Sequence, residues 1–471
     1  MSTPVQLFPI LYCQDSSLWF EQVRQLAMPI WLDSGHPQSS YGRFDIISAA
    51  PAITFTCVGK VTQIAQDNSI QESTENPFTL LQHYLPGNQP HLEHIPFCGG
   101  ILGYFGYDLG RRLESLPVVA LQDISLADMH LGLYPWAIVQ DHHTQKAWLV
   151  INSALAPTYN FLDIEHICSS DLHVARFHDL KSNIKNSEKL FNINEFQAEL
   201  KVGEYRSAVK KIQAYIAAGD CYQVNFAQRF SAEFTGDPFV AYLELRQTLP
   251  SPFSAYMEVT GGAILSLSPE RFIKLQHNQA ETKPIKGTVA RGKTPEEDSA
   301  NAARLLSSVK DRAENLMIVD LLRNDLSKTC VEVNVPELFG LQSFANVHHL
   351  VSTVTASLKP GMNAVDLLAS CFPGGSITGA PKIRAMEIIE ELEPVRRSLY
   401  CGSLGYISAC GNMDTSIAIR TLVCDRNKMY CWGGGGIVAD SETETEYQES
   451  LAKVKVLMDT LEYRFGRVTS T

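Results

Sequence analysis

The chain has 471 residues, of which 45% are hydrophobic and 19% are charged, and this balance is typical of a globular protein with a large core. Its net charge of −12 argues against a protein that binds nucleic acid, because the phosphate backbone requires a basic face. The sequence contains neither the basic start of a secretory signal nor an apolar run near the ~20 residues of a membrane helix. Its 11 cysteines lack disulfide-scaffold or metal-ligand spacing, so we expect a cytoplasmic protein with reduced thiols and no membrane contact.

Short strand-like runs separated by turns occupy roughly the first 180 residues. A polar stretch at 178–194 then indicates a surface connection, after which the pattern becomes more regular. Strands and interspersed helices in this order predict an α+β protein rather than a doubly wound sheet. The expected helices are 202–219, 296–323, 363–371, 380–392 and 443–463. The expected strands are 222–232, 253–260, 263–275, 282–289, 345–357, 400–410, 414–424 and 428–432, with 400–424 forming a hairpin.

Two charged residues stand at or near strand ends. In the strand 282–289, Lys286 points away from the face shared by Ile285 and Val289, which leaves either solvent or a polar cavity for its amine. Glu270 directly follows the strand-like run that Pro269 ends. It is therefore either a catalytic carboxylate at a strand end or a loop carboxylate paired with Arg271.

Two helices carry acidic pairs. Glu314 joins the apolar stripe of its helix, one turn after Asp311, and a carboxylate on a buried stripe needs a cation, a metal or strong donors. Glu446 and Glu449 lie off the apolar stripe of the last helix, so alone they indicate a solvated face. If the two pairs faced each other, their oxygen atoms would suit Mg²⁺.

Two glycine-rich segments could bind an anion, or each could be only a structural turn. In 371–394, a glycine turn with Ser376 precedes a helix that starts near Pro381, and helix N-termini attract anions. In 430–441, four glycines follow a strand and could turn their N–H groups toward a carboxylate as a nest. Arg420 alternates with Ile417 and Ile419 at the end of an apolar strand, where its planar fork could grip a carboxylate.

These motifs together resemble the chorismate-utilising enzymes, and most closely the aminodeoxychorismate synthase branch that supplies 4-aminobenzoate for folate. The resemblance covers roughly 203–460, and a weaker one in the N-terminal third depends on 39–47. It implies an anthranilate synthase component I-like fold, with two packed antiparallel sheets wrapped by helices and interleaved subdomains. It also implies an N-terminal domain at 1–180 and a chorismate-binding catalytic domain at 195–465. The segments that carry it are YQVNFAQRF, SPERF, PIKGT, DRAENLMIVDLLRND, VHHLVST, FPGGSITGAPKIRAMEIIEELEP, GNMDTSIAIRT and GGGIVADSETETEYQES.

The resemblance assigns a role to each candidate residue. It implies Mg²⁺ as cofactor, held directly by Glu314 and Glu449 and through water by Asp311 and Glu446, and in turn holding the ring carboxylate of chorismate. It implies that Glu270 is the general acid that protonates the leaving hydroxyl. The remaining substrate contacts implied are Arg420, Tyr400, Gly435 and Gly436 on the enolpyruvyl carboxylate, and His349 and Ser376 near the ring.

Two positions separate the branches of this family. Enzymes that add water to chorismate have a lysine where Gln223 stands, and Gln223 cannot deprotonate water, so ammonia is the expected nucleophile. Anthranilate synthases have alanine where Lys286 stands, and in the 4-aminobenzoate branch this lysine acts as a nucleophile. A neutral amine would attack C2 as the C4 hydroxyl leaves, and ammonia would then enter C4 and expel the lysine.

No glutaminase motif is found in the sequence, so a separate glutamine amidotransferase subunit is expected to deliver the ammonia. The alternatives are anthranilate synthase component I, which aminates C2 and eliminates pyruvate, and a non-catalytic binding subunit. Anthranilate synthases also hold tryptophan in a pocket whose motifs correspond to 32–34, 41–44 and 250–254. That pocket would bind tryptophan here or form a plain domain interface, and its residues would be Ser34, Tyr41, Gly42, Arg43, Phe44, Pro252, Phe253 and Ser254.

Overall fold

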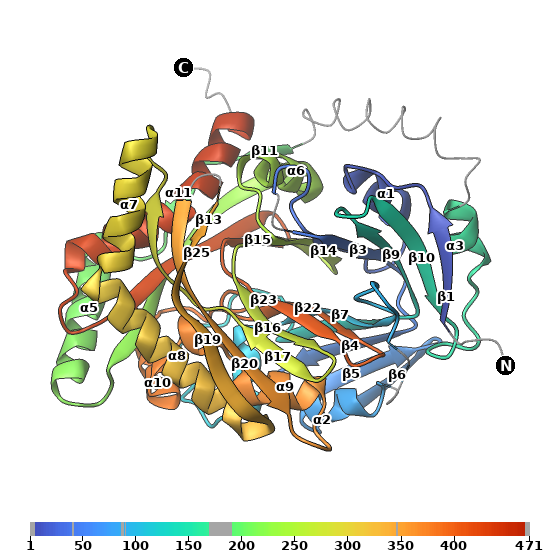
Figure 1. Cartoon of the computed structure of the whole chain (residues 1–471), viewed down its shortest axis with the longest axis horizontal. Coiled ribbons are helices and arrows are strands. Elements are labelled where there is room, and N and C mark those ends of the chain that lie inside the picture. The colour runs from blue at the N-terminus through green and yellow to red at the C-terminus, as the bar shows by residue number, and fades with distance from the viewer. Residues whose placement is uncertain are drawn as a thin grey trace.

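Two large antiparallel sheets with helices around them form the molecule (Figure 1). The computed structural model describes residues 5–39, 42–85, 89, 91–168, 191–344 and 347–466. The predicted α+β class is therefore confirmed, whereas most of the expected connection at 178–194 lies outside the described residues. Within the described part of the chain, no helix combines the length and apolarity needed to cross a membrane.

The larger sheet contains strands from both ends of the chain. In spatial order these are β1 (Val5–Ile10), β10 (Lys146–Asn152), β9 (Trp136–Asp141), β3 (Phe44–Ser48), β2 (Ile30–Asp33), β14 (Phe253–Val259), β15 (Gly262–Ser268), β24 (Thr421–Asp425), β25 (Lys428–Ile437), β13 (Gln223–Gly236) and β11 (Phe191–Ile193). Two short strands, β12 (Gln197–Ala198) and β21 (Gly379–Ala380), also pair with β13.

The second sheet mixes the two ends of the chain in the same way. In spatial order its strands are β18 (Ile285–Ala290), β20 (Val347–Leu358), β17 (Gln279–Thr282), β16 (Arg271–Gln276), β23 (Met413–Ile417), β22 (Ser403–Ser408), β7 (Gly100–Phe105), β8 (Met129–Tyr134), β4 (Ile53–Val58), β5 (Val61–Gln66) and β6 (Ser69–Ser73), and β19 (Cys330–Ser343) pairs with β20. The helices are α1 (Ser17–Val23), α2 (Pro77–Gln82), α3 (Leu162–Ile167), α5 (Val202–Ala217), α6 (Pro238–Thr248), α7 (Pro295–Ser307), α8 (Val309–Thr329), α9 (Ala364–Cys371), α10 (Lys382–Leu392) and α11 (Thr443–Phe465), with short 3-10 turns η1 (Tyr107–Arg112) and η4 (Gly375–Ile377).

Strand pairing joins the N-terminal and C-terminal parts in both sheets. β2 pairs with β14 in the larger sheet, and β7 pairs with β22 in the second sheet. This arrangement confirms the expected interleaving, while the division at 1–180 and 195–465 stays a prediction. One apolar core includes side chains from both sheets, such as Ile264, Phe55 and Ile273, and a second packs α1, α6 and α11 against the larger sheet.

Several expected elements differ from the structure. The strand expected at 263–275 is β15 and β16, which belong to different sheets. The helix expected at 296–323 is two helices, because the Ser308 side chain accepts from the Asp311 N–H and caps α8. The strand expected at 414–424 is β23 and β24, which belong to different sheets, and Arg420 adopts φ +49° in the connection between them. The strand expected at 428–432 continues through the glycines to Ile437, whereas the hairpin at 400–424 is confirmed as β22 and β23.

A buried ion pair joins the segments that carry the candidate site. Arg397 is 1% exposed and donates to both carboxylate oxygens of Glu393, at 2.9 and 2.7 Å. It also donates to the carbonyl of Ile377 in η4 at 2.9 Å and to the carbonyl of Asn225 in β13 at 2.6 Å. Glu393 also accepts from the Ala227 N–H at 2.9 Å. Arg397 thus holds η4 and β13 in one fixed relation.

We expect Arg397→Met to lower the free energy of unfolding by about 3–5 kcal/mol, because it leaves the Glu393 carboxylate buried without its partner. Urea titration followed by circular dichroism measures this loss. Arg396→Met is the matched control, since the adjacent arginine bonds the exposed Gln122 side chain at 2.7 Å and should cost less than about 1 kcal/mol. Equal losses in the two variants would contradict the structural role given to Arg397.

Candidate active site

Lys286 lies in a polar site between the two sheets rather than in bulk solvent. Its side chain is 12% exposed, and its Nζ donates to the Ser376 carbonyl at 3.2 Å and pairs with Glu314 Oε1 at 3.3 Å. The strand does not alternate simply here, because the β18–β20 register shifts between Ile285 and Thr288 and Gly287 has φ +79°. Of the two environments left open by the sequence, the structure excludes bulk solvent, because polar groups surround the amine.

The Glu314 carboxylate is shared by two donors. Besides Lys286, the Gln223 amide donates to Glu314 Oε1 at 3.1 Å. Gly436 faces both groups across the strand pair β13–β25: a Cβ there would meet the Gln223 amide nitrogen at 1.8 Å and Glu314 Oε1 at 2.9 Å. Glycine at this position therefore leaves the space in which the two side chains meet. Gly435 and Gly436 lie in β25 and pair with β13, so the N–H groups expected to face a carboxylate belong to a strand, and their role as a nest stays a prediction.

Glu270 belongs to the same site. It lies between β15 and β16, is 7% exposed, and meets the Ser376 hydroxyl and the Ile285 N–H through its carboxylate. Burial raises the pKa of Glu270, and the nearby charge of Lys286 only partly opposes this shift. The alternative pairing with Arg271 is wrong, because Arg271 bonds Asp414 at 2.9 and 3.1 Å.

Arg420 brings a second cation to the site. Its guanidinium makes no hydrogen bond or ion pair with any side chain in the described ranges, yet its charge acts on both Glu270 and His349. Burial lowers the pKa of Arg420. Burial also lowers the pKa of His349 to about 4, with Arg420 adding to the effect, so this imidazole is neutral at pH 7. His349 is held by a 2.8 Å hydrogen bond to the Thr288 hydroxyl.

Tyr400 packs near the connection that carries Arg420, without a hydrogen bond to Arg420. Its ring is buried and stacks on Trp432 of β25 at 5.6 Å, with 4° between the planes. The next residue, Cys401, donates its N–H to the Ala418 carbonyl at 2.9 Å, close to the connection that carries Arg420. No hydrogen bond joins Tyr400 to Arg420 in the described part of the chain.

The second acidic pair approaches the site from α11. A Cβ on Gly435 would lie 3.3 Å from Glu446 Oε2 and 3.7 Å from Glu449 Oε1. Glu446 is 2% exposed and accepts from the Ser441 hydroxyl at 2.7 Å, so the solvated face expected for it is wrong. The buried face of α11 includes Glu446, Ser450 and Val454, whose spacing of four residues aligns the glutamate with the core. Glu449 is 47% exposed.

Two lysines missed by the sequence interpretation neutralise this pair. Lys453 lies 2.8 Å from Glu449, and Lys310 lies 3.8 Å from Glu446. Burial raises the pKa of Glu449, but the lysines outweigh this effect and hold the pKa below its ordinary value. The i,i+4 spacing of Glu449 and Lys453 was the available signal, whereas Lys310 comes from another helix and carried none.

The carboxylates have the chemistry that a hard divalent cation requires. Glu314 and the α11 pair converge on adjacent glycines of β25, and Asp311 packs within 2.9 Å of a Cβ built on Gly287. Oxygen donors of this kind suit Mg²⁺, and ammonium groups now compensate their charge. Across the described residues, no three acidic, histidine or cysteine side chains are already arranged as a metal centre. The residues therefore fit Mg²⁺ in donor type, and binding would require the ammonium groups to move.

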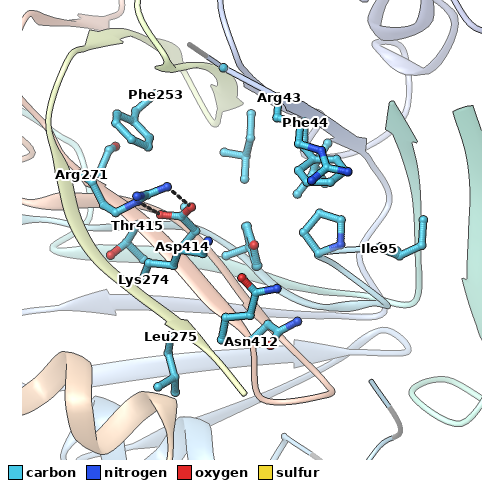
Figure 2. A pocket seen from close by; sticks show the side chains of 18 of the residues that line it. Arg43, Phe44, Ile95, Phe253, Arg271, Lys274, Leu275, Asn412, Asp414 and Thr415 are labelled. Carbon is cyan, nitrogen blue, oxygen red and sulfur yellow. Dashed lines mark hydrogen bonds and ion pairs between the residues drawn. The ribbon is translucent and has the colours of Figure 1, made fainter. Parts of the chain in front are cut away.

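Six of the eight residues expected around tryptophan line a separate cavity of about 680 Å³. Figure 2 shows Arg43 and Phe44 on one side, Phe253 and Arg271 on another, and Asn412 below them. The Arg271 guanidinium lies over the Phe253 ring at 5.0 Å. Of the expected set, Gly42, Arg43, Phe44, Pro252, Phe253 and Ser254 line the cavity, and Tyr41 lies outside the described residues.

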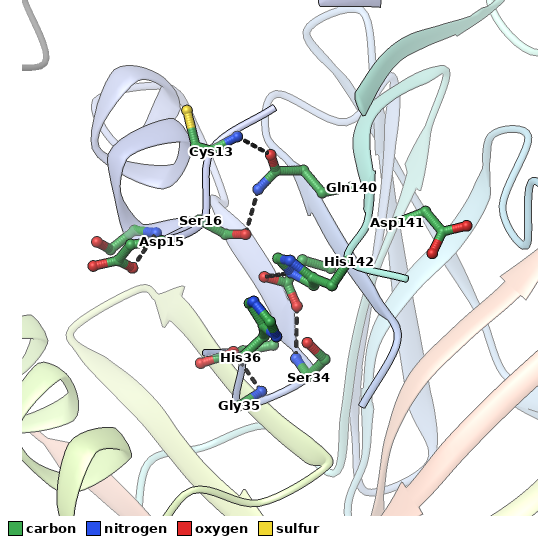
Figure 3. Close-up of polar contacts among 12 residues, drawn as sticks. Cys13, Asp15, Ser16, Ser34, Gly35, His36, Gln140, Asp141 and His142 are labelled. Atoms are coloured by element: carbon green, nitrogen blue, oxygen red, sulfur yellow. Dashed lines mark hydrogen bonds and ion pairs between the residues drawn. The ribbon is translucent and has the colours of Figure 1, made fainter. Parts of the chain in front are cut away.

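A buried polar network surrounds Ser34 (Figure 3). The Ser34 N–H donates to Asp45 Oδ1 at 2.7 Å, and His142 Nε2 lies 3.0 Å from Asp45 Oδ2. His142 also stacks on His36 at 4.1 Å. The Ser34 hydroxyl is buried, and its hydrogen bond to Asp45 helps to lower the pKa of that carboxyl. Ser34 is not among the residues that line the cavity.

The chain resembles proteins of one enzyme family over nearly its full length. The sequence profile of the chorismate binding enzyme family matches residues 29–459. Aminodeoxychorismate synthase component 1 from Escherichia coli (strain K12) is 46% identical over 459 residues, covering 96% of this chain and 98% of that protein. Anthranilate synthase component 1 from Aquifex aeolicus (strain VF5) is 35% identical over 446 residues, covering 92% of this chain and 89% of that protein.

Solved structures share the fold. Anthranilate synthase component I from Streptococcus pneumoniae TIGR4 superposes with a TM-score of 0.76 at 32% identity, covering 89% of this chain and 93% of that one. The menaquinone-specific isochorismate synthase from Escherichia coli superposes with a TM-score of 0.71 at 18% identity, covering 97% of this chain and 94% of that one. The predicted anthranilate synthase component I-like fold is thereby confirmed, and the chain belongs to the chorismate binding enzyme family.

Proposed function

We propose that this enzyme aminates chorismate at C4 to form 4-amino-4-deoxychorismate, through a covalent bond to Lys286. The observation that carries the proposal is the Lys286 amine, held 3.3 Å from Glu314 and 3.2 Å from the Ser376 carbonyl inside the site. The relative from Escherichia coli with 46% identity is named for the synthesis of aminodeoxychorismate. The product would enter 4-aminobenzoate and folate synthesis.

The reaction is two successive displacements. The neutral Lys286 amine bonds to C2 of the ring, the double bond shifts, and the C4 hydroxyl leaves as water after receiving a proton from Glu270. Ammonia then bonds to C4, the double bond shifts back, and the C2–nitrogen bond to Lys286 breaks. Burial raises the pKa of Glu270, which favours the protonated acid that this step needs. The enolpyruvyl group is retained throughout.

The other polar residues hold the substrate. The Arg420 guanidinium has no partner of its own in the described residues, which supports its proposed grip on the enolpyruvyl carboxylate with Tyr400, Gly435 and Gly436. Neutral His349 and Ser376 would face the ring and its leaving hydroxyl. Gln223 is an amide that cannot deprotonate water, which favours ammonia as nucleophile.

Mg²⁺ is the proposed cofactor, held directly by Glu314 and Glu449 and through water by Asp311 and Glu446. When bound, it would supply positive charge to the ring carboxylate of the substrate. The proposed source of ammonia is a separate glutamine amidotransferase subunit, an idea supported by the name "component 1" of the relatives. We propose a cytoplasmic location for this assembly.

With chorismate, Mg²⁺ and ammonium, we expect a product that retains its enolpyruvyl group and a transient mass adduct on the protein. Lys286→Ala should abolish the adduct and lower turnover on the order of 10³-fold or more, as loss of a nucleophile does. Intact-protein mass spectrometry and product chromatography measure both outcomes.

Lys283→Ala is the matched control for this experiment, because Lys283 is 33% exposed and lies 3.5 Å from Glu281. It should retain both adduct and turnover. Free pyruvate without an added lyase would reject C4 amination in favour of anthranilate synthesis. An adduct that persists in Lys286→Ala would reject the nucleophile alone.

Removal of Mg²⁺ with EDTA should abolish amination, and added Mg²⁺ should restore it. At a concentration a hundredfold above its Kd, Mg²⁺ should stabilise the folded protein by about 2.7 kcal/mol. Glu314→Gln should raise the Kd about tenfold or more, a loss of about 1.4 kcal/mol. Thermal unfolding with and without Mg²⁺ measures the Kd of each variant. Asp320→Asn is the control, because Asp320 is 79% exposed on the same helix, and its Kd should equal that of the parent protein. An unchanged Kd in Glu314→Gln would remove Glu314 from the ligand set.

The separate cavity is proposed to bind tryptophan between Phe44 and Phe253, which both line it. We expect titration calorimetry with L-tryptophan to show binding that Phe253→Ala weakens by about 0.5–1.5 kcal/mol, the worth of an aromatic contact. Tyr463→Ala, 93% exposed on α11, is the control. Absence of heat with the parent protein would favour a plain interface between the sheets.

A further inference from the structure

Two cysteines lie side by side where the N-terminal part meets the β22–β23 hairpin. Cys98 precedes β7 and Cys410 follows β22, and these strands pair so that Ser408 lies opposite Gly100. The Ser408 hydroxyl oxygen is 3.3 Å from the Sγ of each cysteine, and the two thiols also hydrogen bond to each other. The pair is thus held in direct contact by a rigid strand pairing.

The two sulfur atoms differ in their ionisation. The hydrogen bond from Cys98 is the largest cause that lowers the pKa of Cys410, and the Ser408 hydroxyl and the Asn412 N–H lower it further. The same contact raises the pKa of Cys98. The arrangement favours a thiolate at Cys410 beside a thiol at Cys98, and the thiolate is the reactive form of cysteine.

The cavity described above is lined by residues that neighbour this pair in the chain, although neither cysteine lines it. His91, Ile95 and Pro96 line the cavity from the segment before Cys98, and Asn412 lines it from the turn that carries Cys410 (Figure 2 labels Ile95 and Asn412). Cys410 is 7% exposed, whereas Cys98 is fully buried. The cavity-lining His91 is close enough for its charge to act on the Cys410 thiol, so the lining residues separate a small solute in the cavity from the more reactive sulfur.

We propose that Cys98 and Cys410 form a redox-sensitive modification site, at which a small peroxide converts the two thiols into a disulfide under the cavity. The Cys410 thiolate attacks a peroxide oxygen, the O–O bond breaks, and a sulfenic acid forms with release of water after protonation. The Cys98 sulfur then attacks the Cys410 sulfur, the S–O bond breaks, and a second water leaves. Two thiols lose two electrons and two protons in total, and a dithiol reductant reverses the change.

The other cysteines provide contrast. Cys330 and Cys371 lie close enough for their charges to interact, yet burial raises the pKa of both thiols. Cys330 and Cys371 should therefore stay reduced, because neither thiol is favoured as a thiolate. Burial also raises the pKa of Cys57, Cys168, Cys221, Cys401, Cys424 and Cys431.

The test exposes the reduced full-length protein to hydrogen peroxide and maps the product by mass spectrometry under non-reducing conditions. We expect the mass to fall by two hydrogens, a peptide that links Cys98 to Cys410, and full reversal by dithiothreitol. Cys98→Ser should instead accumulate a sulfenic acid on Cys410 that dimedone traps. Cys410→Ser should trap none, and Cys371→Ser, the matched control, should still form the Cys98–Cys410 link.

Three results would overturn the proposal: a folded parent protein that keeps its full mass, a disulfide that maps to other cysteines, or equal dimedone labelling of Cys98→Ser and Cys410→Ser. Mapping of the parent protein does not depend on how well the variants fold. Thermal unfolding of each variant shows whether its labelling reports the native arrangement.

Discussion

The candidate site depends on one buried carboxylate, that of Glu314, which must find hydrogen-bond donors or cations between the two sheets. Glu314 comes from α8, which packs on the second sheet, yet its carboxylate reaches the larger sheet at Gly436 and Gln223. A carboxylate withdrawn from water requires donors or cations, and Lys286 and Gln223 supply them. The Lys286 amine is thus held in place by its attraction to the Glu314 carboxylate. A divalent ion bound to Glu314 would change that attraction.

Several buried contacts give this site its geometry. Arg397 and Glu393 connect η4 to β13, so Ser376 and Gln223 approach Lys286 from fixed backbones. The irregular strand pairing at Gly287 means that the direction of the Lys286 side chain does not follow the simple alternation of a regular strand. Preorganisation of this kind matters for covalent catalysis, since the amine, the acid and the leaving group must be aligned before reaction.

The candidate site and the cavity are neighbours through shared strands. Glu270 faces the site, while the next residue, Arg271, lines the cavity and bonds Asp414. β23 likewise runs from the cavity floor to the connection that carries Arg420. A ligand in the cavity, or a disulfide beside it, would therefore contact the strands that position Glu270 and Arg420.

Local sequence signals determined much of this protein. Apolar periodicity and caps located α5, α9, α10 and α11 closely, and Pro269 marked the strand end where Glu270 lies, because these signals depend on neighbours within a few residues. The motifs also identified the residues that converge on Lys286. The break between α7 and α8 was not predicted from apolar periodicity, although Ser308 is a residue type that often caps helices.

Only the tertiary structure decided how those residues are used. Arg420 leaves its strand because the chain crosses from one sheet to the other, and Glu446 is buried because α11 turns that face toward the larger sheet. The contacts of Lys310 with Glu446 and of Cys98 with Cys410 join residues more than a hundred positions apart in the chain. No local pattern encodes such contacts, since they arise from strand pairing and helix packing across the whole chain.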